Sequence, residues 1–241
     1  MSGNLYLSAA SAEARLQQLD VIADNLANTT TNGFRATEVV FESVLDAALE
    51  DGASAGDVAR SFVASTQAAL RSGTGPIQRT GRDLDVAIQG PGYLVVETDA
   101  GVRYTRNGAL HVDEEGQLVS ADGHLVLGEG GPIDVGGRPV TIESDGAVRN
   151  DEGELLGRLR IDEFLDPDAL TKEGGSLLRA SETAVGVPVE APRLASGSLE
   201  SSNVLAVQEM ARLIAVQRAF DAALQTLEAD DAASGRLLQE I

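Results

Sequence analysis

The side chains most able to do chemistry are two histidines and a short acidic run. His111 and His124 are the only histidines, and Asp113, Glu114 and Glu115 follow one another directly. Carboxylates so close in sequence cannot hold a glycosidic bond between them at the separation of about 5 Å or more that glycosidases need. A lone histidine in a strand is more often structural than catalytic. We therefore predict no catalytic residue, no small-molecule substrate and no enzyme activity.

Motifs that would bring a cofactor or a metal are also missing from the sequence. It contains no Gly-x-Ser-x-Gly elbow, no His-Glu-x-x-His helix and no phosphate-binding loop. Its Asp-Gly turns lack the alternating oxygen ligands and the terminal glutamate of a calcium loop. Cysteine is absent, which excludes disulfides and thiolate zinc sites. We predict that the protein uses no cofactor and no metal.

The charge of the chain limits its partners. The 18 basic and 38 acidic residues give a net charge of −20, which argues against a nucleic-acid partner because phosphate binding needs a basic patch. No apolar run approaches the roughly 18 residues of a membrane span, so we predict no membrane insertion. The first residues also lack the basic region and apolar core of a cleaved secretory signal.

The elements that would position any functional residue are clearest at the two ends of the chain, where apolar residues recur at alternating steps of three and four. The N-terminal stripe comprises Ala9, Ala12, Leu16, Leu19, Ala23 and Leu26, and the C-terminal stripe comprises Ala206, Met210, Leu213, Gln217, Phe220, Leu224 and Leu227. This spacing keeps one side of a helix apolar, as in the seam of a coiled coil. We predict a first helix that ends near Asn28, where β-branched residues follow, and a last helix from about Val204. Ser202 or Asn203 would cap its N-terminus.

The middle of the chain has short β-like runs in place of a helical period. The runs are Leu84–Ile88, Tyr93–Glu97, Val102–Arg106, Leu110–Asp113, Gln117–Ser120, His124–Leu127 and Val140–Glu143. The dipeptides Pro91-Gly92, Asp122-Gly123 and Asp145-Gly146 separate them as turns. Regular punctuation of this kind predicts a β domain built mainly from hairpins.

These patterns predict an α+β fold, in which a mainly-β central domain is flanked by terminal amphipathic helices that pair as a coiled-coil-like inner domain. We divide the chain into an axial helix and turn (1–34), a linker or arm (35–75), the β domain (76–196) and a C-terminal axial helix (197–241). Within the second segment, Val39 to Leu45 could be a short helix or an extended arm, and Gly52 to Gly56 form a break.

Four stretches, in order along nearly the whole chain, resemble the bacterial flagellar rod and hook proteins. They are Asp24–Asn28 with Thr31–Arg35; Thr80–Tyr93; Tyr104–Gly108 with Gly116–Val119 and Asp122-Gly123; and Gly197–Val204 with Glu209-Met210 and Gln217–Phe220. Within the family, the opening Thr80-Gly81-Arg82, the run Gly128–Ile133 and the modest length look most like the proximal rod subunit.

The resemblance implies a structural subunit of the flagellar basal-body rod, which crosses the periplasm and transmits torque. Its terminal helices would pair into an inner tube and polymerise with copies of itself and with other rod proteins. It would leave the cell through the flagellar type III export apparatus without a cleaved signal peptide. The implied assembly interface comprises Leu16, Leu19, Asn25, Leu26, Asn28, Gly33, Phe34, Asn203, Met210, Leu213, Gln217, Phe220, Leu224 and Leu227.

Several alternatives stay open at this point. The terminal stripes could be core helices of one globular domain. Gln217 is either a harmless, partly exposed residue or a polar residue that sets the register between packed helices. Asn25 and Asn28 could be ordinary residues at a helix end, although we expect at least one to cap the turn into Gly33. The distal rod or hook subunit is the runner-up within the family. A secreted β domain that binds or cleaves glycans is the alternative from another class.

Overall fold

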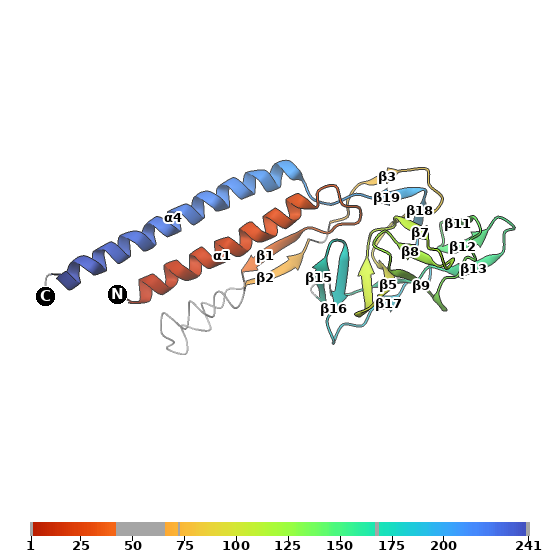
Figure 1. Ribbon diagram of the computed structural model, residues 1–241, viewed down its shortest axis with the longest axis horizontal. Helices are drawn as coiled ribbons and strands as arrows, with labels where there is room; N and C mark the ends of the chain where they lie inside the picture. Colours follow the sequence, from red (N-terminus) through yellow and green to blue (C-terminus); the bar gives the residue numbers. More distant parts are fainter. Residues whose placement is uncertain (1, 42–65, 72, 167–168, 240–241) are drawn as a thin grey trace. The chain divides into compact units, whose positions relative to one another are not determined.

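A computed structural model describes residues 2–41, 66–71, 73–166 and 169–239. The chain forms two compact units, each assembled from separate parts of the sequence (Figure 1). We call residues 1–27, 37–69 and 205–241 the helical unit, and residues 28–36 and 70–204 the β unit. The predictions for Val44, Leu45 and Gly52–Gly56 lie outside the described residues.

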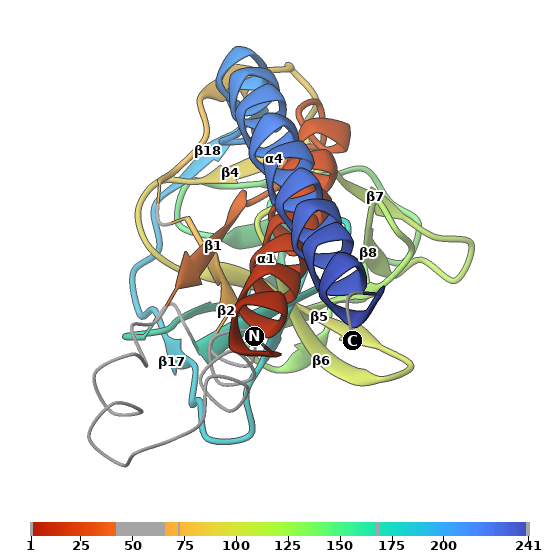
Figure 2. The same ribbon diagram turned by 90° about the vertical axis from the view of Figure 1, so that its left-hand side faces the viewer.

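The helical unit contains the two long helices. They are α1 (Ser2–Ala27) and α4 (Ala206–Gln239), which contact each other and lie side by side in both Figure 1 and Figure 2. The predicted end of the first helix is confirmed, because α1 stops just before the run Asn28–Thr31, whose β-branched residues favour helix poorly. The last helix begins at Ala206, two residues later than predicted. Neither helix, within the described residues, is long and apolar enough to cross a membrane.

A two-stranded sheet accompanies these helices. Its strands are β1 (Thr37–Phe41) and β2 (Thr66–Leu70), and α1 contacts β1. Part of the segment that the sequence left ambiguous is therefore extended rather than helical. Among the described strands, this is the only sheet to which the helical unit contributes residues.

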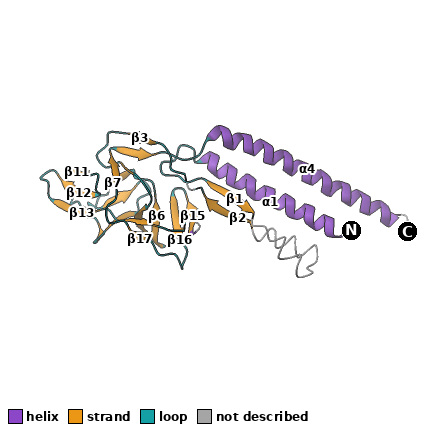
Figure 3. Cartoon of the chain, turned by 180° about the vertical axis from the view of Figure 1, so that it is seen from behind, coloured by secondary structure: helices purple, strands orange, loops and turns teal. Residues whose placement is uncertain are grey.

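The described part of the β unit is built mainly from short strands joined by tight turns (Figure 3). The strands are β3 (Ile77–Arg79), β4 (Val86–Ile88), β5 (Tyr93–Thr98), β6 (Gly101–Thr105), β7 (Leu110–Val112), β8 (Leu118–Ser120), β9 (Leu125–Gly128), β10 (Gly131–Pro132), β11 (Val140–Ile142), β12 (Ala147–Asn150), β13 (Leu155–Arg158), β14 (Ile161–Glu163), β15 (Leu170–Gly174), β16 (Leu177–Ala180), β17 (Val187–Pro188), β18 (Leu194–Ser196) and β19 (Ser198–Glu200). All seven predicted runs are confirmed as strands, and the mainly-β class with a helix at each end is confirmed with them.

Ten of these strands form one antiparallel sheet. Its main path is β15-β16-β6-β5-β9-β8-β7, to which β10, β14 and β17 are added at the side. Strands β11, β12 and β13 form a separate meander. The Asp-Gly turns work as predicted, because Gly123 and Gly146 adopt φ values of +81° and +85°, which residues with a Cβ rarely do.

Two small sheets join the beginning of the β unit to its end. Strand β4 pairs with β18, so that Ile88 lies opposite Leu194, and β3 pairs with β19, so that Gln78 lies opposite Leu199. Both pairings span more than a hundred residues of chain. They place the residues that precede α4 beside those that open the β unit.

The core of the β unit lies between the main sheet, the meander and the β4–β18 pair. Its fully buried side chains include Val86, Leu94, Val96, Leu110, Leu118, Val126, Val148, Leu159 and Ile161. A second cluster gathers around Tyr104, whose ring meets that of Phe164 edge-on at 4.7 Å between centroids. Edge-to-face packing is a favourable arrangement for aromatic pairs.

Candidate assembly site

Within the helical unit, the side chain of Asn25 ties the end of α1 to the start of β1. Its Nδ2 donates to the carbonyl of Thr37 at 2.8 Å, and the amide of Thr37 donates to its Oδ1 at 3.0 Å. Asn25 is buried, as is Thr37. Because the amide side chain satisfies both main-chain groups of a buried residue, it takes the place of a neighbouring strand.

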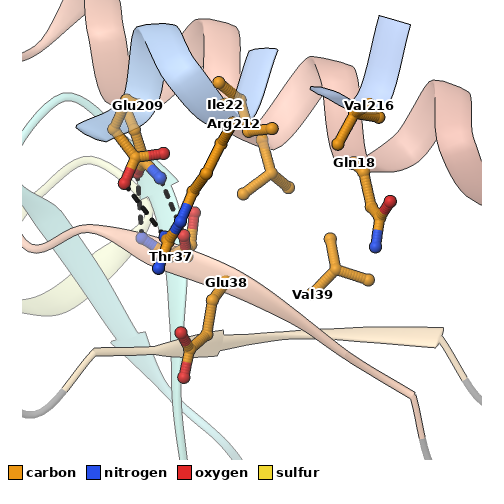
Figure 4. A pocket seen from close by; sticks show the side chains of 10 residues that line it. Gln18, Ile22, Thr37, Glu38, Val39, Glu209, Arg212 and Val216 are labelled. Carbon is orange, nitrogen blue, oxygen red and sulfur yellow. Dashed lines mark hydrogen bonds and ion pairs between the residues drawn. The ribbon is translucent and has the colours of Figure 1, made fainter. Parts of the chain in front are cut away.

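A cavity of about 200 Å³ lies beside this contact, between α1, β1 and α4. Figure 4 shows Gln18 and Ile22 from α1, Thr37, Glu38 and Val39 from β1, and Glu209, Arg212 and Val216 from α4 around it. Val21 and Asn25 complete the lining. The wall is thus mixed, with apolar valines and isoleucine beside amide and charged groups.

The carboxylate of Glu209 is fully buried at the first turn of α4. Its Oε1 accepts a hydrogen bond from Nη1 of Arg212 at 3.1 Å, one turn further along the helix. An acidic side chain at this end of a helix also interacts favourably with the positive end of the helix dipole. The hydrogen bond from Arg212 and the helix dipole therefore both stabilise the buried carboxylate of Glu209.

The predicted C-terminal stripe divides between two sides of α4. Met210, Gln217 and Leu224 are exposed, whereas Leu213 and Phe220 are half-buried. The less exposed side of α4 runs through Glu209, Leu213, Val216 and Phe220. Near the middle of the helix, this side passes through Val216, whereas the predicted stripe passes through Gln217. Successive residues lie about 100° apart around a helix, so the two sides differ there by a rotation of about that angle. The side chain of Leu227 is outside the described part of the chain.

The predicted N-terminal stripe is divided in a similar way. Leu19 and Leu26 are half-buried, but Leu16 is 46% exposed. Ala12 of the stripe is buried, and so are Ile22 and Asn25, which lie outside it. The helical unit therefore brings together part of each stripe and leaves the rest of each on its surface.

In the β unit, three of the motif stretches meet at a buried carboxylate. Glu200, from β19, lies 3.0 Å from Nη2 of Arg35 and 3.2 Å from Nη1 of Arg106. All three side chains are buried. The Arg106 guanidinium also donates to the carbonyls of Ile88 at 3.3 Å and Gly90 at 2.7 Å, and Arg35 donates to the carbonyl of Gly73. We call Arg35, Arg106 and Glu200 the arginine–glutamate cluster.

Gly33 lies against this cluster in a conformation that only glycine adopts easily. Its φ is +68°, and its amide donates to the carbonyl of Glu200 at 2.7 Å. A Cβ at this position would come within 2.2 Å of the amide nitrogen of Asn107. The prediction that Gly33 supplies a special backbone conformation is confirmed, and close packing adds a second reason for glycine.

Two further residues of the predicted interface, Phe34 and Asn28, make contacts inside the β unit. Phe34 packs with Ala36 and Val204 in a small buried cluster, and Nζ of Lys172 lies 3.6 Å from its ring centroid. Asn28 accepts from the hydroxyl of Thr31 at 3.1 Å and so stabilises the turn that follows α1. The capping role expected for one of the two asparagines stays a prediction, since this bond joins two side chains.

The expected N-cap of the last helix is wrong. Asn203 uses its side chain elsewhere: Oδ1 accepts from the amide of Ala36 at 2.7 Å, and Nδ2 donates to the carbonyl of Gly73 at 2.7 Å. Ser202 accepts from the amide of Val204, which precedes the helix, at 3.2 Å. Asn203 therefore joins three segments of the β unit and does not cap α4.

Four buried charged residues lie inside the motif stretches but are absent from the predicted interface, namely Arg35, Arg106, Glu200 and Glu209. The available signal was a lone charged residue among apolar or small residues, because burying a charge is unfavourable unless it is paired.

Within the described residues, no group of three or more His, Cys, Asp or Glu side chains could hold a metal ion.

Three regions of the chain match known protein families. Residues 5–35 match the family described as flagella basal body rod protein, residues 87–150 the flagellar hook protein FlgE/F/G D1 domain, and residues 195–240 the C-terminal region of the flagellar basal body rod FlgEFG proteins. The protein belongs to the flagellar basal-body rod and hook family, and it is a structural rod protein by that membership.

Individual relatives agree with this assignment. The chain is 36% identical over 225 residues to the flagellar basal-body rod protein FlgF of Mesorhizobium japonicum, which covers 92% of this chain and 90% of the relative. It is 34% identical over 253 residues to FlgF of Escherichia coli, covering 99% and 98%. It is also 33% identical over 264 residues to the rod protein FlgG of Bacillus subtilis, covering 100% and 98%.

Proposed function

We propose that this chain is a subunit of the proximal part of the flagellar rod and that it polymerises through its terminal helices. Family membership supports the rod, and the contact between α1 and α4 supports a paired inner domain. In this proposal the pairing is coiled-coil-like and the β domain, residues 76–196, stays outside the tube. The protein performs no catalysis, and it leaves the cell through the type III export apparatus with its N-terminus uncleaved.

Polymerisation is supported above all by the outer side of α4, which is apolar and exposed. Val207, Met210 and Ile214 are 81%, 50% and 52% exposed, although all three are large apolar residues. Val207 and Val216 are nine residues apart, which places them on opposite sides of a helix with about 3.6 residues per turn. A helix that packs on one side and exposes an apolar stripe on the other is suited to contact a further subunit.

Nine of the fourteen predicted interface residues fit the same proposal in two groups. Leu16, Met210, Gln217 and Leu224 lie on the surface of the helical unit, where a neighbour can reach them. Asn25, Asn28, Gly33, Phe34 and Asn203 make contacts inside their own units, so we propose that they act on assembly by holding those units in shape.

The names of the relatives support a second assignment within the rod. Relatives named FlgF and FlgG match the chain with overlapping identities, 33–36% and 27–33%. A distal rod subunit of the same family is therefore the alternative. Complementation of strains that lack either subunit distinguishes the two.

The polymerisation proposal is tested by placing a charge on the outer side of α4. Ile214→Asp should abolish rod assembly and swimming, because a carboxylate cannot be buried against an apolar neighbour without a partner. Gln208→Asp adds the same charge at another exposed position of α4 and should assemble normally. The melting temperature of the purified chain should be unchanged in both variants. Normal swimming with Ile214→Asp would refute this use of the outer side.

A further inference from the structure

Two asparagine–glycine dipeptides lie against each other in the β unit. They are Asn32-Gly33, which follows α1, and Asn107-Gly108, which follows β6, and they are the two dipeptides of this kind in the sequence. A Cβ on Gly33 would lie 2.2 Å from the amide nitrogen of Asn107, so the main chains of the two dipeptides are in direct contact. The fold therefore brings two chemically labile positions to one place.

An asparagine that precedes glycine is prone to lose ammonia without the help of an enzyme. The amide nitrogen of the glycine gives up its proton and attacks Cγ of the asparagine, a C–N bond forms, and the side-chain nitrogen leaves as ammonia. Water then opens the resulting succinimide at one of its two carbonyls, which yields aspartate or isoaspartate. Glycine favours the attack because it has no Cβ and its main chain rotates freely. The reaction therefore needs a free glycine amide and a peptide group that can rotate into line.

The folded chain withholds both requirements at Asn32. The amide of Gly33, which would be the nucleophile, donates to the carbonyl of Glu200 at 2.7 Å, so its proton is held. The amide of Phe34 donates to the carbonyl of Thr31 at 3.3 Å, which closes a tight turn over Asn32 and Gly33. Gly33 is itself buried. The peptide group between Asn32 and Gly33 therefore cannot rotate while Glu200 is in place.

The second dipeptide is held by β4. The carbonyl of Gly108 accepts from the amide of Val86 at 3.0 Å, and a Cβ on Gly108 would fall 1.8 Å from the carbonyl oxygen of Val86. Asn107 is buried, and its Oδ1 accepts from the amide of Ala109 at 3.2 Å. Both the attacking segment and the side chain under attack are thus immobilised when the β unit is closed.

We propose that Asn32 and Asn107 are sites of spontaneous deamidation that are open while the β unit is unfolded and are closed together when it folds. Strand β19 supplies Glu200 and comes late in the chain, so Asn32 stays reactive until nearly the whole β unit has emerged. The proposal does not rest on the rod function, because all of these residues belong to one unit of one chain.

Deamidation before closure should leave a chain that cannot close. Isoaspartate adds a methylene group to the main chain, and the main chain has no room to shift at Gly33, where a Cβ would also lie 2.3 Å from the carbonyl carbon of Arg106. The close approach of Gly108 to Val86 leaves equally little room at the second site. Isoaspartate at either position should therefore be found only in chains that fail to refold.

The test is peptide mapping by mass spectrometry of the full chain, incubated either folded in buffer or unfolded in guanidinium chloride at the same pH and temperature. Conversion of Asn32 and Asn107 should be at least about tenfold slower in the folded chain, because the rate follows the small fraction of molecules that are open. In guanidinium chloride, Gly33→Ala should slow the reaction at Asn32 and leave that at Asn107 unchanged. Equal rates in the folded and unfolded chain would overturn the proposal.

Two variants separate the β unit from the helical unit as the source of protection. Glu200→Gln weakens the arginine–glutamate cluster and should speed conversion at both sites in buffer, whereas Asn25→Ala acts on the helical unit and should speed neither. A faster reaction in Asn25→Ala than in Glu200→Gln would refute the assignment to the β unit. The comparison of folded and unfolded wild type stands even if Glu200→Gln does not fold.

Refolding after the incubation in guanidinium chloride tests the link to closure. Separation of refolded from unfolded chains by size-exclusion chromatography should place isoaspartate at positions 32 and 107 in the unfolded fraction alone. Isoaspartate at either position in the refolded fraction would contradict the claim that the closed β unit has no room for it.

Discussion

Asn25 and Thr37 exchange two hydrogen bonds, of 2.8 and 3.0 Å, across a stretch of chain that leaves the helical unit and returns to it. Residues 28–36, which lie between them, belong to the β unit. One asparagine side chain therefore fixes the point where the chain re-enters the unit formed by α1 and α4.

Asn25→Ala should destabilise the helical unit by about 2–4 kcal/mol, because it leaves a buried amide and a buried carbonyl of Thr37 without partners. The measurement is urea unfolding followed by helical circular dichroism. Asn28→Ala is the matched control, since the side chain of Asn28 bonds the half-buried hydroxyl of Thr31 and not a buried main-chain group of Thr37. Equal losses in the two variants would show that the Asn25 bonds contribute little.

Glu200→Gln should destabilise the β unit by about 3–5 kcal/mol, the usual cost of leaving buried charges uncompensated. Two guanidinium groups depend on this one carboxylate. Glu152→Gln removes an exposed partner of Arg138 at 3.8 Å and should change stability by no more than about 0.5 kcal/mol. Chemical unfolding followed by tyrosine fluorescence checks both, and a small effect of Glu200→Gln would mean that other groups neutralise the arginines.

Gly33→Ala should cost more than Gly81→Ala, although both glycines have positive φ, of +68° and +77°. The backbone strain is similar, of order 1–2 kcal/mol. A Cβ at Gly33 also meets the main chain of Asn107, whereas one at Gly81 has nothing within 4 Å. The difference in unfolding free energy between the two variants isolates the close contact, and equal losses would contradict it.

The β11–β12 turn should lose stability in acid. A hydrogen bond from the amide of Ala147, and then the charge of Arg158, hold the pKa of Asp145 below its usual value. A carboxyl with a lowered folded pKa stabilises the protein fully above its unfolded pKa, near 4, and loses that contribution as the pH falls through the folded pKa. The difference in unfolding free energy between wild type and Asp145→Asn should therefore be constant at neutral pH and shrink below about pH 4. A difference that does not vary with pH would refute the assignment.

The two sides of α4 should respond differently to mutation in the purified chain. Leu213→Ala removes a half-buried side chain and should destabilise the helical unit by about 1–2 kcal/mol, less than a fully buried leucine would. Gln217→Leu changes an exposed residue and should alter stability by no more than about 0.5 kcal/mol. If Gln217→Leu stabilised the helical unit strongly, Gln217 would face the interior of the chain.

The sequence predicts local structure in this protein better than it predicts packing. The end of α1 and seven of the eight strands between residues 84 and 143 follow from β-branched residues, alternation and Asp-Gly turns, all of which act over a few residues. The later strands, from β12 to β19, were not predicted, because runs such as Leu155–Arg158 are short and do not alternate clearly. The packed side of α4 was misplaced because Val216 and Gln217 are adjacent, so only a partner helix decides between them.

The contacts within the arginine–glutamate cluster could not be predicted from the sequence. Arg35, Arg106 and Glu200 come from distant motifs. They meet where β3 pairs with β19, where Arg106 bonds the carbonyl of Ile88 in β4, and where the amide of Gly33 bonds the carbonyl of Glu200. Pairings over such distances depend on the whole fold rather than on local preference. Gly33 was predictable as a glycine with positive φ, but its close approach to Asn107 was not.

The two helices of the helical unit come from opposite sides of the β unit in the sequence, so the order in which the chain emerges decides when the helical unit can form. A polypeptide that emerges N-terminus first delivers α1 early and α4 last, with the entire β unit between them. Until α4 arrives, α1 lacks its helical partner, and an isolated helix of this length is only marginally stable in water. The β unit can close as soon as β19 has emerged, whereas the helix pair must wait for α4. Emergence of α4 is therefore the event that first allows the pairing surface to form.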